Sequence, residues 1–308
     1  MLRIIVLGAG AGGGFPQWNC NCSNCQRARA GDKAARHLTQ SSLAVSADDG
    51  ISWYLLNASP DVRQQITQTS ALHPRTGRRD SPIAGVVLSN ADVDHVAGLL
   101  TLREAQPLVV YATSRVLAVL KTNAIFNVLN PDLVVRRAMP LDQPLEIRGP
   151  DGRSGGFSLT AFPVPGKVAL WLEEPGLAHF GSVAEDTVGL EISGAGRRFF
   201  YLPGCAELPD GVTERLKGAD LVFFDGTTWT DDEMIVLGLG TKTASRMGHI
   251  SMAGAAGSIA TFASLNVARK IFVHINNSNP VLIAGTPERA AAIAAGWEIG
   301  ADGMEVRL

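Results

Sequence analysis

Short apolar runs separated by turn residues are the feature of this 308-residue chain that most limits its fold. Such runs are typical of buried β-strands, and the residues between them are typical of turns. They predict strands at residues 2–7, 43–45, 52–56, 83–88, 108–111, 157–164, 188–192, 198–202, 221–224 and 271–274. Helical patterns fall at 97–105, 114–120, 251–263 and 287–295, the last with Thr286 as its N-cap before Pro287. Two sheets packed face to face with helices outside suit this order, so we expect an α/β fold of the αββα sandwich type, formed as a single domain over residues 1–308.

Composition and charge exclude several classes of function. The formal net charge of −2 gives no global basic field that would attract nucleic acid or an anionic membrane. No run of 18 apolar residues is present, and the first residues have the pattern of a strand rather than of a signal peptide. We therefore expect a cytoplasmic protein without nucleic-acid or membrane partners, whose four cysteines are reduced and serve as ligands or core residues. The oligomeric state stays open, a homo-oligomer included.

A glycine-rich segment at residues 8–14 follows the first predicted strand and contains the pattern GxGxxG. In a dinucleotide-binding fold this pattern opens a helix, and an acidic residue ends the next strand about 20 residues further on. Here Phe15 and Pro16 follow the glycines, which disfavours a helix, and the strand near Leu43 ends without the required acid. We therefore expect a tight turn beside a site, and no dinucleotide.

Three cysteines follow this turn within six residues, in the sequence CNCSNC. A tight loop can point Cys20, Cys22 and Cys25 at one ion, and three unrelated buried cysteines would rarely have this spacing. Thiolates favour zinc, which takes four ligands in a structural site. The sequence predicts a structural Zn²⁺ on these cysteines, with a fourth ligand that the local sequence does not supply.

Metal-capable side chains also gather directly after the predicted strand 83–88. Asp92, Asp94 and His95 stand in the sequence SNADVDH, and a helix beginning near Val96 would fix their direction. A single aspartate or histidine in a loop is usually solvated. Three such groups within four residues, at the carboxyl end of a strand, favour a ligand cluster instead.

Three later residues stand at similar positions. His274 ends the run 271–274, His249 stands just before the predicted helix 251–263, and Asp225 follows the run 221–224. A lone strand-end histidine is more often structural than catalytic, and Asp225 is equally well explained as a turn or cap residue. Because the aspartate cluster needs further ligands, the predicted active-site metal ligands are Asp92, Asp94, His95 and His274, with His249 and Asp225 lining the cleft.

The segment from the strand at 83–88 through Asn90-x-Asp92-x-Asp94-His95 to the following helix resembles the HxHxDH motif of the metallo-β-lactamase superfamily. The glycine-rich loop with CxCxxC resembles the branch containing the phosphodiesterase of phosphonate degradation, which carries a structural zinc on such cysteines. Cys205, where the superfamily has the aspartate of GDT, and then His249 and His274 follow in the expected order. The resemblance covers nearly the whole chain and implies a metallo-β-lactamase-type αββα sandwich.

Departures from the hydrolase pattern narrow this resemblance. Asn90 and Asp92 replace the first two histidines, Cys205 replaces the bridging aspartate, and Lys167 stands where hydrolases usually place a histidine. With CNCSNC and SNADVDH, these changes resemble a family of proteins of pyrroloquinoline quinone (PQQ) biosynthesis, and they argue for a single active-site ion. In the phosphodiesterase relative, a histidine three residues after the last active-site histidine can complete the zinc site. That position is Asn277 here, with His37 or an open position as alternatives.

The family resemblance implies two different functions. One is an iron- and oxygen-dependent hydroxylase of the tyrosine in a Glu–Tyr unit cut from a precursor peptide. The other is a carrier that assists transport of PQQ or its precursor to the periplasm. Two histidines with one carboxylate approximate the ligand set of non-heme iron oxygenases, which favours the first function and Fe²⁺, with Zn²⁺ or Mn²⁺ as alternatives. A metal-dependent hydrolase is a third alternative, weakened by the incomplete motif.

The expected substrate, a small-molecule or dipeptide PQQ precursor, carries several carboxylates. Lys167, and Arg246 just before the His249 turn, are therefore the predicted substrate-binding residues, although lysine and arginine are common at surfaces. His249 is the predicted general acid or base because imidazole titrates near neutrality, with Asp225 as the second predicted catalytic residue.

Overall fold

The computed structural model describes residues 1–174 and 182–308, and within these ranges the strands form two seven-stranded sheets. The first sheet has the order β14 (Glu305–Arg307), β1 (Arg3–Gly8), β2 (Ser42–Ser46), β3 (Trp53–Leu56), β4 (Ile83–Val87), β5 (Leu108–Ala112), β6 (Val134–Ala138). The second has the order β13 (Trp297–Ile299), β12 (Lys270–Val273), β11 (Leu221–Asp225), β10 (Arg197–Leu202), β9 (Val188–Gly194), β8 (Ser154–Pro163), β7 (Leu145–Arg148).

Each sheet is parallel on one side and antiparallel on the other. The parallel strands are β3 to β6 in the first sheet and β10 to β13 in the second. Ligands of open α/β sheets bind outside the carboxyl ends of parallel strands. The loops that leave β4, β11 and β12 are therefore the segments in which a site is expected.

Alternation along the strands produces two apolar layers. Ile4 and Val6 of β1 belong to the core between the two sheets, together with Leu190 and Phe200 of the second sheet. The intervening Ile5 and Leu7 face the opposite side of the first sheet and belong to a second core. This period of two, with apolar residues on both faces, is what a sheet covered on both sides requires.

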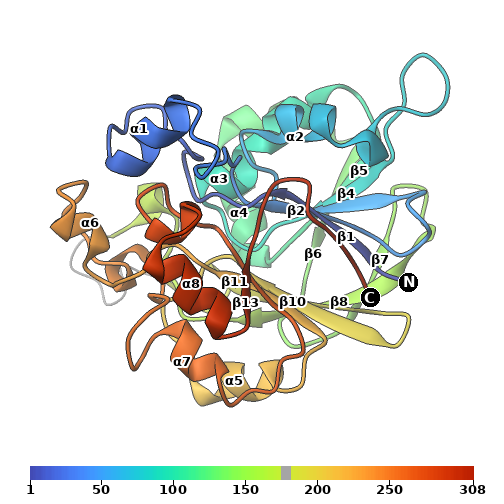
Figure 1. Ribbon diagram of the computed structural model, residues 1–308. Coiled ribbons are helices and arrows are strands. Elements are labelled where there is room, and N and C mark those ends of the chain that lie inside the picture. The colour runs from blue at the N-terminus through green and yellow to red at the C-terminus, as the bar shows by residue number, and fades with distance from the viewer. Residues whose placement is uncertain (175–181) are drawn as a thin grey trace.

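Helices cover the outer face of each sheet (Figure 1). The second core contains Val62 of α2, Val96 of α3 and Val116 of α4, which pack on the first sheet. On the second sheet, Phe262 of α7 packs edge-on against Phe224 of β11. The helices are α1 (Ser23–Arg29), α2 (Val62–Gln68), α3 (Val93–Val96), α4 (Ser114–Thr122), α5 (Asp210–Leu216), α6 (Glu233–Val236), α7 (Ser258–Phe262) and α8 (Pro287–Ala294). The predicted αββα sandwich is confirmed.

Three predicted helices differ in detail. The helix expected at 251–263 is only α7, because Gly254 has a φ of +93° and the chain turns until Gly257, the N-cap. The helix expected near Val96 begins earlier, at Val93, and the segment expected at 97–105 is a 3-10 helix, Ala97–Arg103. The N-cap at Thr286 is confirmed, since its side chain accepts a hydrogen bond from the Arg289 N–H.

Among residues 1–174 and 182–308, no helix combines the length and the apolar character that crossing a membrane would need.

Candidate metal centres

Loops from both sheets meet at one edge of the sandwich. The Val188 N–H donates to the Ser89 carbonyl at 2.9 Å, which joins the loop after β4 to the second sheet. The Ala11 N–H donates to the Ile275 carbonyl at 2.9 Å, which joins the glycine-rich loop to the residues after β12. These contacts bring the aspartate cluster and His274, far apart in the sequence, to one place.

Asp94, His95 and His274 form the tightest donor group at this edge. One ligand atom from each lies within 4.8 Å of the others. The Oδ2 atom of Asp94 is 3.0 Å from Nε2 of His274 and 3.7 Å from Nε2 of His95. His95 and His274 are buried, with 1% and 5% of their surfaces exposed. Two imidazoles and one carboxylate therefore converge on a single point.

The second nitrogen of each imidazole is held by an oxygen atom. Nδ1 of His95 lies 2.6 Å from Oδ1 of Asn90. That oxygen also accepts the Asp92 N–H, so it is the amide oxygen, and His95 must carry its proton on Nδ1. Nδ1 of His274 lies 2.9 Å from the hydroxyl of Thr227. Both Nε2 atoms are thus turned toward Asp94.

The Nε2 atom of His95 is buried and has no hydrogen-bond partner among the described residues. An unpaired polar atom in this position costs free energy unless something occupies the space in front of it. A metal ion among the two Nε2 atoms and the Asp94 carboxylate would satisfy all three. The residues present therefore fit a single metal ion.

Burial and neighbouring groups set the protonation of these three residues. Burial lowers the pKa of His95 below its ordinary value, so this imidazole is neutral. Burial works to raise the pKa of Asp94, but its interactions with the neighbouring His95 and His274 outweigh burial and hold that pKa well below its usual range. For His274 burial favours the neutral form, whereas its hydrogen bond to Asp94 and the nearby aspartates raise its pKa. Without metal, a protonated His274 neutralises Asp94.

Asp225 and His249 form a second, hydrogen-bonded pair beside this group. The Nδ1–H of His249 donates to Oδ2 of Asp225 at 2.7 Å, and the fully buried carboxylate also accepts the Cys205 N–H and the Thr227 N–H. His249 does not lie at the start of a helix as expected. It follows Gly248, whose φ of +89° ends the 3-10 helix Ser245–Met247, while α7 begins further along the chain.

Asp225, His249 and His274 also have ligand atoms within 4.8 Å of one another. Thr227 links the three residues. Its hydroxyl lies 2.7 Å from Oδ1 of Asp225, 3.1 Å from Nδ1 of His249 and 2.9 Å from Nδ1 of His274. Because the carboxylate takes the Nδ1 proton of His249, the other ring nitrogen is the one free for proton exchange. The sequence reasoning gave no role to Thr227.

Asp92 is not a member of either histidine-containing donor group. One of its oxygens pairs with the ammonium of Lys167 at 3.2 Å, and the other accepts a hydrogen bond from the Asn90 amide at 3.3 Å. Of the two aspartates proposed as ligands, the structure thus brings Asp94 to the histidines and sets Asp92 against Lys167.

A cavity of about 270 Å³ opens in front of these groups. Lys167 lines it, whereas Arg246 lies in a neighbouring hollow and pairs with Glu173 at 2.9 Å. Besides Thr227, the lining residues that the sequence did not indicate are Leu170, Met234, Lys242, Met247 and Asn276. No motif surrounds Lys242 or the two methionines, so no sequence pattern indicated them.

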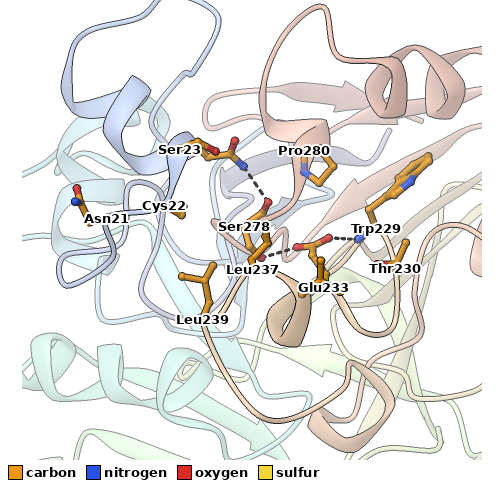
Figure 2. A pocket seen from close by; sticks show the side chains of 12 residues that line it. Asn21, Cys22, Ser23, Trp229, Thr230, Glu233, Leu237, Leu239, Ser278 and Pro280 are labelled. Atoms are coloured by element: carbon orange, nitrogen blue, oxygen red, sulfur yellow. Dashed lines mark hydrogen bonds between the residues drawn. The ribbon is translucent and has the colours of Figure 1, made fainter.

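A larger cavity, about 600 Å³, lies between the cysteine loop and α6 (Figure 2). Its walls include Leu237, Leu239 and Pro280, and its buried acid, Glu233, already accepts hydrogen bonds from Ser278 and the Trp229 N–H. No imidazole lines it among the described residues. The smaller cavity is therefore the one associated with the aspartates and histidines.

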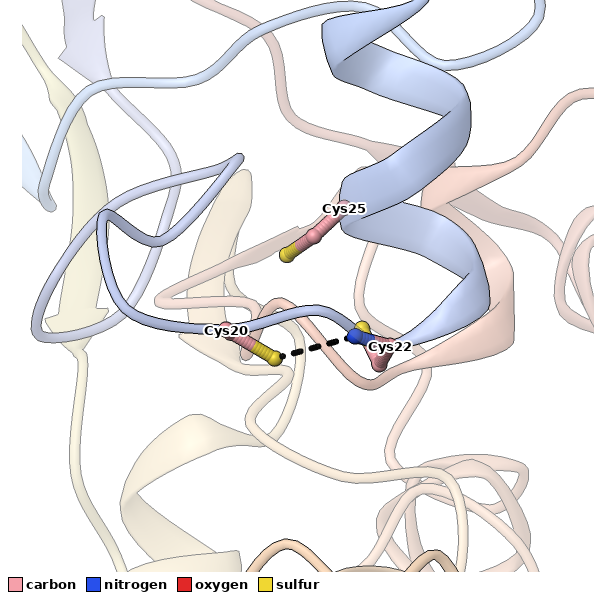
Figure 3. Close-up of side chains that lie close together, drawn as sticks. All are labelled: Cys20, Cys22 and Cys25. Atoms are coloured by element: carbon pink, nitrogen blue, oxygen red, sulfur yellow. Dashed lines mark hydrogen bonds between the residues drawn. The ribbon is translucent and has the colours of Figure 1, made fainter.

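The side chains of Cys20, Cys22 and Cys25 converge at the start of α1 (Figure 3). Their sulfur atoms lie within 4.8 Å of one another, a spacing compatible with one zinc ion and Zn–S bonds of about 2.3 Å. Burial raises the pKa of the Cys25 thiol to about 11, so a metal ion is needed to hold this sulfur as a thiolate. Cys205 is not in this group, because it lies after β10 and its thiol donates to the Glu207 carbonyl.

Asn277 completes the enclosure of the three sulfurs. Its amide Nδ2 lies 3.0 Å from Cys20, 3.7 Å from Cys22 and 3.3 Å from Cys25. His37 instead lies 3.1 Å from the Ala28 carbonyl through Nε2 and is not a member of the donor group. Of the two candidate fourth ligands, the structure brings only Asn277 to the sulfurs.

Similar proteins of known family identify the family of this chain. The model of the beta-lactamase superfamily domain matches residues 52–275. The coenzyme PQQ synthesis protein B of Gluconacetobacter diazotrophicus is 53% identical over 307 residues, with 99% of both chains covered. Its counterpart from Rhodopseudomonas palustris strain TIE-1 is 54% identical over 313 residues, with 100% of both chains covered. This chain belongs to the coenzyme PQQ synthesis protein B family.

The family includes a solved structure, Zn²⁺-bound PqqB from Methylobacterium extorquens. It has 50% sequence identity and a TM-score of 0.94, with 99% of this chain and 100% of that chain covered. A diphosphatase of the PhnP family shares the fold, at 18% identity and a TM-score of 0.69, with 100% and 98% covered. Membership of the PqqB family makes the chain a protein of PQQ biosynthesis and confirms the predicted metallo-β-lactamase fold.

Proposed function

We propose that this protein is an iron- and oxygen-dependent hydroxylase that acts on the tyrosine ring of a small Glu–Tyr precursor of PQQ. The observation that carries the proposal is the convergence of two imidazoles and one carboxylate, His95, His274 and Asp94, on one point. This donor set with open positions is the one that non-heme iron oxygenases use. Iron, when bound there, would supply the redox chemistry with oxygen that zinc cannot.

The surrounding residues would prepare the substrate. Apolar side chains, Leu170, Met234 and Met247, line the cavity and suit an aromatic ring. His249, oriented by Asp225, would exchange a proton with the phenol through its free ring nitrogen. One atom of O2 would be inserted into a ring C–H bond to give C–OH, and a reductant would supply the two electrons that, with two protons, convert the other oxygen atom to water.

Hydrolysis is less well supported by the same residues. The bridging aspartate of the hydrolases is replaced by Cys205, whose thiol is buried and occupied by the Glu207 carbonyl. Burial and the charge of Asp225 raise the pKa of this thiol above its ordinary value, and Cys205 belongs neither to the donor groups nor to the lining of the metal cavity.

The Zn²⁺ of the solved relative supports metal binding by this chain, and we assign zinc to the cysteine site. We also propose the cytoplasm as the place of action, since thiols stay reduced there and remain available as ligands.

The test is direct. Protein purified without air and loaded with Fe²⁺ is given L-glutamyl-L-tyrosine and a reductant, and labelled oxygen gas is admitted. We expect one labelled oxygen atom on the ring by mass spectrometry, and none with His274→Ala, which should keep its cysteine-bound zinc. Binding of the dipeptide without turnover, with iron shown at the His95 and His274 site, would favour the carrier function instead.

A further inference from the structure

Lys167 is a fixed cation in the wall of the metal cavity. Its ammonium pairs with Asp92 at 3.2 Å, and its carbonyl accepts the Thr187 hydroxyl at 2.9 Å. Its aliphatic stem packs against Gly248, where an added Cβ would lie 3.1 Å from the Lys167 Cγ. An ammonium has three donors, and Asp92 takes one of them. No other acceptor contacts this ammonium within the described part of the chain, so its remaining donors can meet a ligand in the cavity.

Lys242 lines the same cavity from the segment between α6 and His249. Over the described residues, its ammonium makes no hydrogen bond or ion pair. The charge of Lys242 helps to lower the pKa of Glu173, but both oxygens of this carboxylate contact Arg246, at 2.9 and 3.4 Å. Among residues 1–174 and 182–308, Lys242 thus lines the cavity without a direct contact to a carboxylate, and Glu173 is an acidic neighbour already bound by Arg246.

The charges of the wall decide which ligands suit the cavity. Its charged side chains, other than the imidazoles, are Asp92, Asp94, Lys167 and Lys242, and their formal charges cancel. A divalent ion on Asp94, His95 and His274 would then leave a net charge of about +2 in a partly enclosed space, where electrostatic attraction is strong. A ligand with two negatively charged groups would balance this charge.

We propose that Lys167 and Lys242 form a two-point carboxylate clamp, so that the cavity selects a ligand in which two carboxylates flank an apolar or aromatic group. The inference rests on the proposed function only in placing the ligand in the metal cavity, and it does not depend on oxygen chemistry. Arg246, tied to Glu173, has no place in this clamp.

Calorimetry without oxygen tests the clamp on full-length protein carrying zinc in both centres, since zinc supports no redox turnover. The probes are glutarate and its monoamide, and L-glutamyl-L-tyrosine with L-glutaminyl-L-tyrosine and with the C-terminal amide. We expect each diacid to bind about 10- to 100-fold more tightly than its amide, the range of a charged hydrogen bond. In Lys242→Met, one of these preferences should disappear, and in Lys242→Arg it should persist.

The matched control is Lys217→Met, an exposed lysine that pairs with Glu214 outside the cavity and should leave every Kd unchanged. A diacid preference that survives intact in both Lys242→Met and Lys167→Met would overturn the clamp. So would unchanged KM for hydroxylation in Lys242→Met, which would leave the proposed function standing. Conversely, a lysine-dependent preference for glutarate without binding of L-glutamyl-L-tyrosine would support the clamp and contradict the proposed substrate.

Discussion

Asn90 orients a candidate metal ligand, His95, through a hydrogen bond to its ring. Its amide oxygen accepts both the Asp92 N–H and the Nδ1–H of His95, so it fixes the ring orientation and the tautomer of the histidine. Groups that hold a ligating imidazole in this way tune its metal affinity. Asn90, which stands at the first histidine position of HxHxDH, thus orients His95 in this site.

Replacing Asn90 by alanine should therefore weaken active-site metal binding about 10- to 100-fold, because His95 would be free to rotate and to change tautomer. Calorimetric titration measures the Kd of the active-site metal, and a separate zinc assay measures the zinc that the cysteines retain. The cysteine site should stay loaded. Asn127→Ala, at an exposed position, is the control. Equal affinities in the two variants would show that Asn90 does not orient the ligand.

The neighbouring aspartates mark the limit of residue-scale prediction. The motif located both Asp92 and Asp94, but not which of them faces the histidines. That depends on Lys167, which lies 75 positions from Asp92 in the chain and holds its carboxylate. Long-range pairing of this kind leaves no local pattern in a sequence, and the same is true of Lys242.

At the scale of elements, the strands that the sequence did not predict are β6, β7, β13 and β14, and these are the four edges of the two sheets. Inner strands are apolar on both faces and produce continuous apolar runs. Edge strands are short or polar, as in the alternation of buried and exposed residues along β7, because edges are protected against further pairing. The predictable part of the fold was its buried interior.

The cysteine loop is the element whose stability should depend most on metal. Cys22→Ser would remove one of three sulfurs that enclose the zinc position, and where the ion supplies folding energy its loss is destabilising. We expect loss of about one equivalent of zinc and a Tm lower by more than about 5 °C. Cys205→Ala is the control for zinc content, since its sulfur lies in another part of the fold. Retained zinc and an unchanged melt in Cys22→Ser would contradict the assignment.

At the scale of the whole molecule, Asp302 joins the two ends of the chain. Its carboxylate accepts the Ala9 N–H and both the N–H and the hydroxyl of Thr39, which ties the turn before β14 to the glycine-rich loop. Burial raises the pKa of Asp302 to about 6, although these hydrogen bonds act to lower it, and the charge of Asp61 adds to the rise.

This raised pKa predicts a pH dependence of stability. Between about pH 4 and pH 6 the folded protein keeps a proton on Asp302 that the unfolded chain has lost, so its contribution to the free energy of unfolding falls as pH rises. Urea unfolding gives the free energy of unfolding of the wild type and of Asp302→Asn at about pH 4 and at about pH 6. The wild-type value, relative to that of the variant, should fall by about 2 kcal/mol between these two pH values. A difference that is constant with pH would show that Asp302 titrates normally.

The stretch from His274 to Asn277 belongs to both candidate centres at once. His274, held at a φ of +55°, faces Asp94, and the Asn277 amide reaches the cysteine sulfurs, while the Asn277 carbonyl accepts the Asn24 amide at 3.2 Å. An inserted or deleted residue between them would shift one centre against the other, whatever its side chain. The length of this stretch is therefore constrained independently of its side chains, and indel scanning should find it intolerant where the nearby surface turns are permissive.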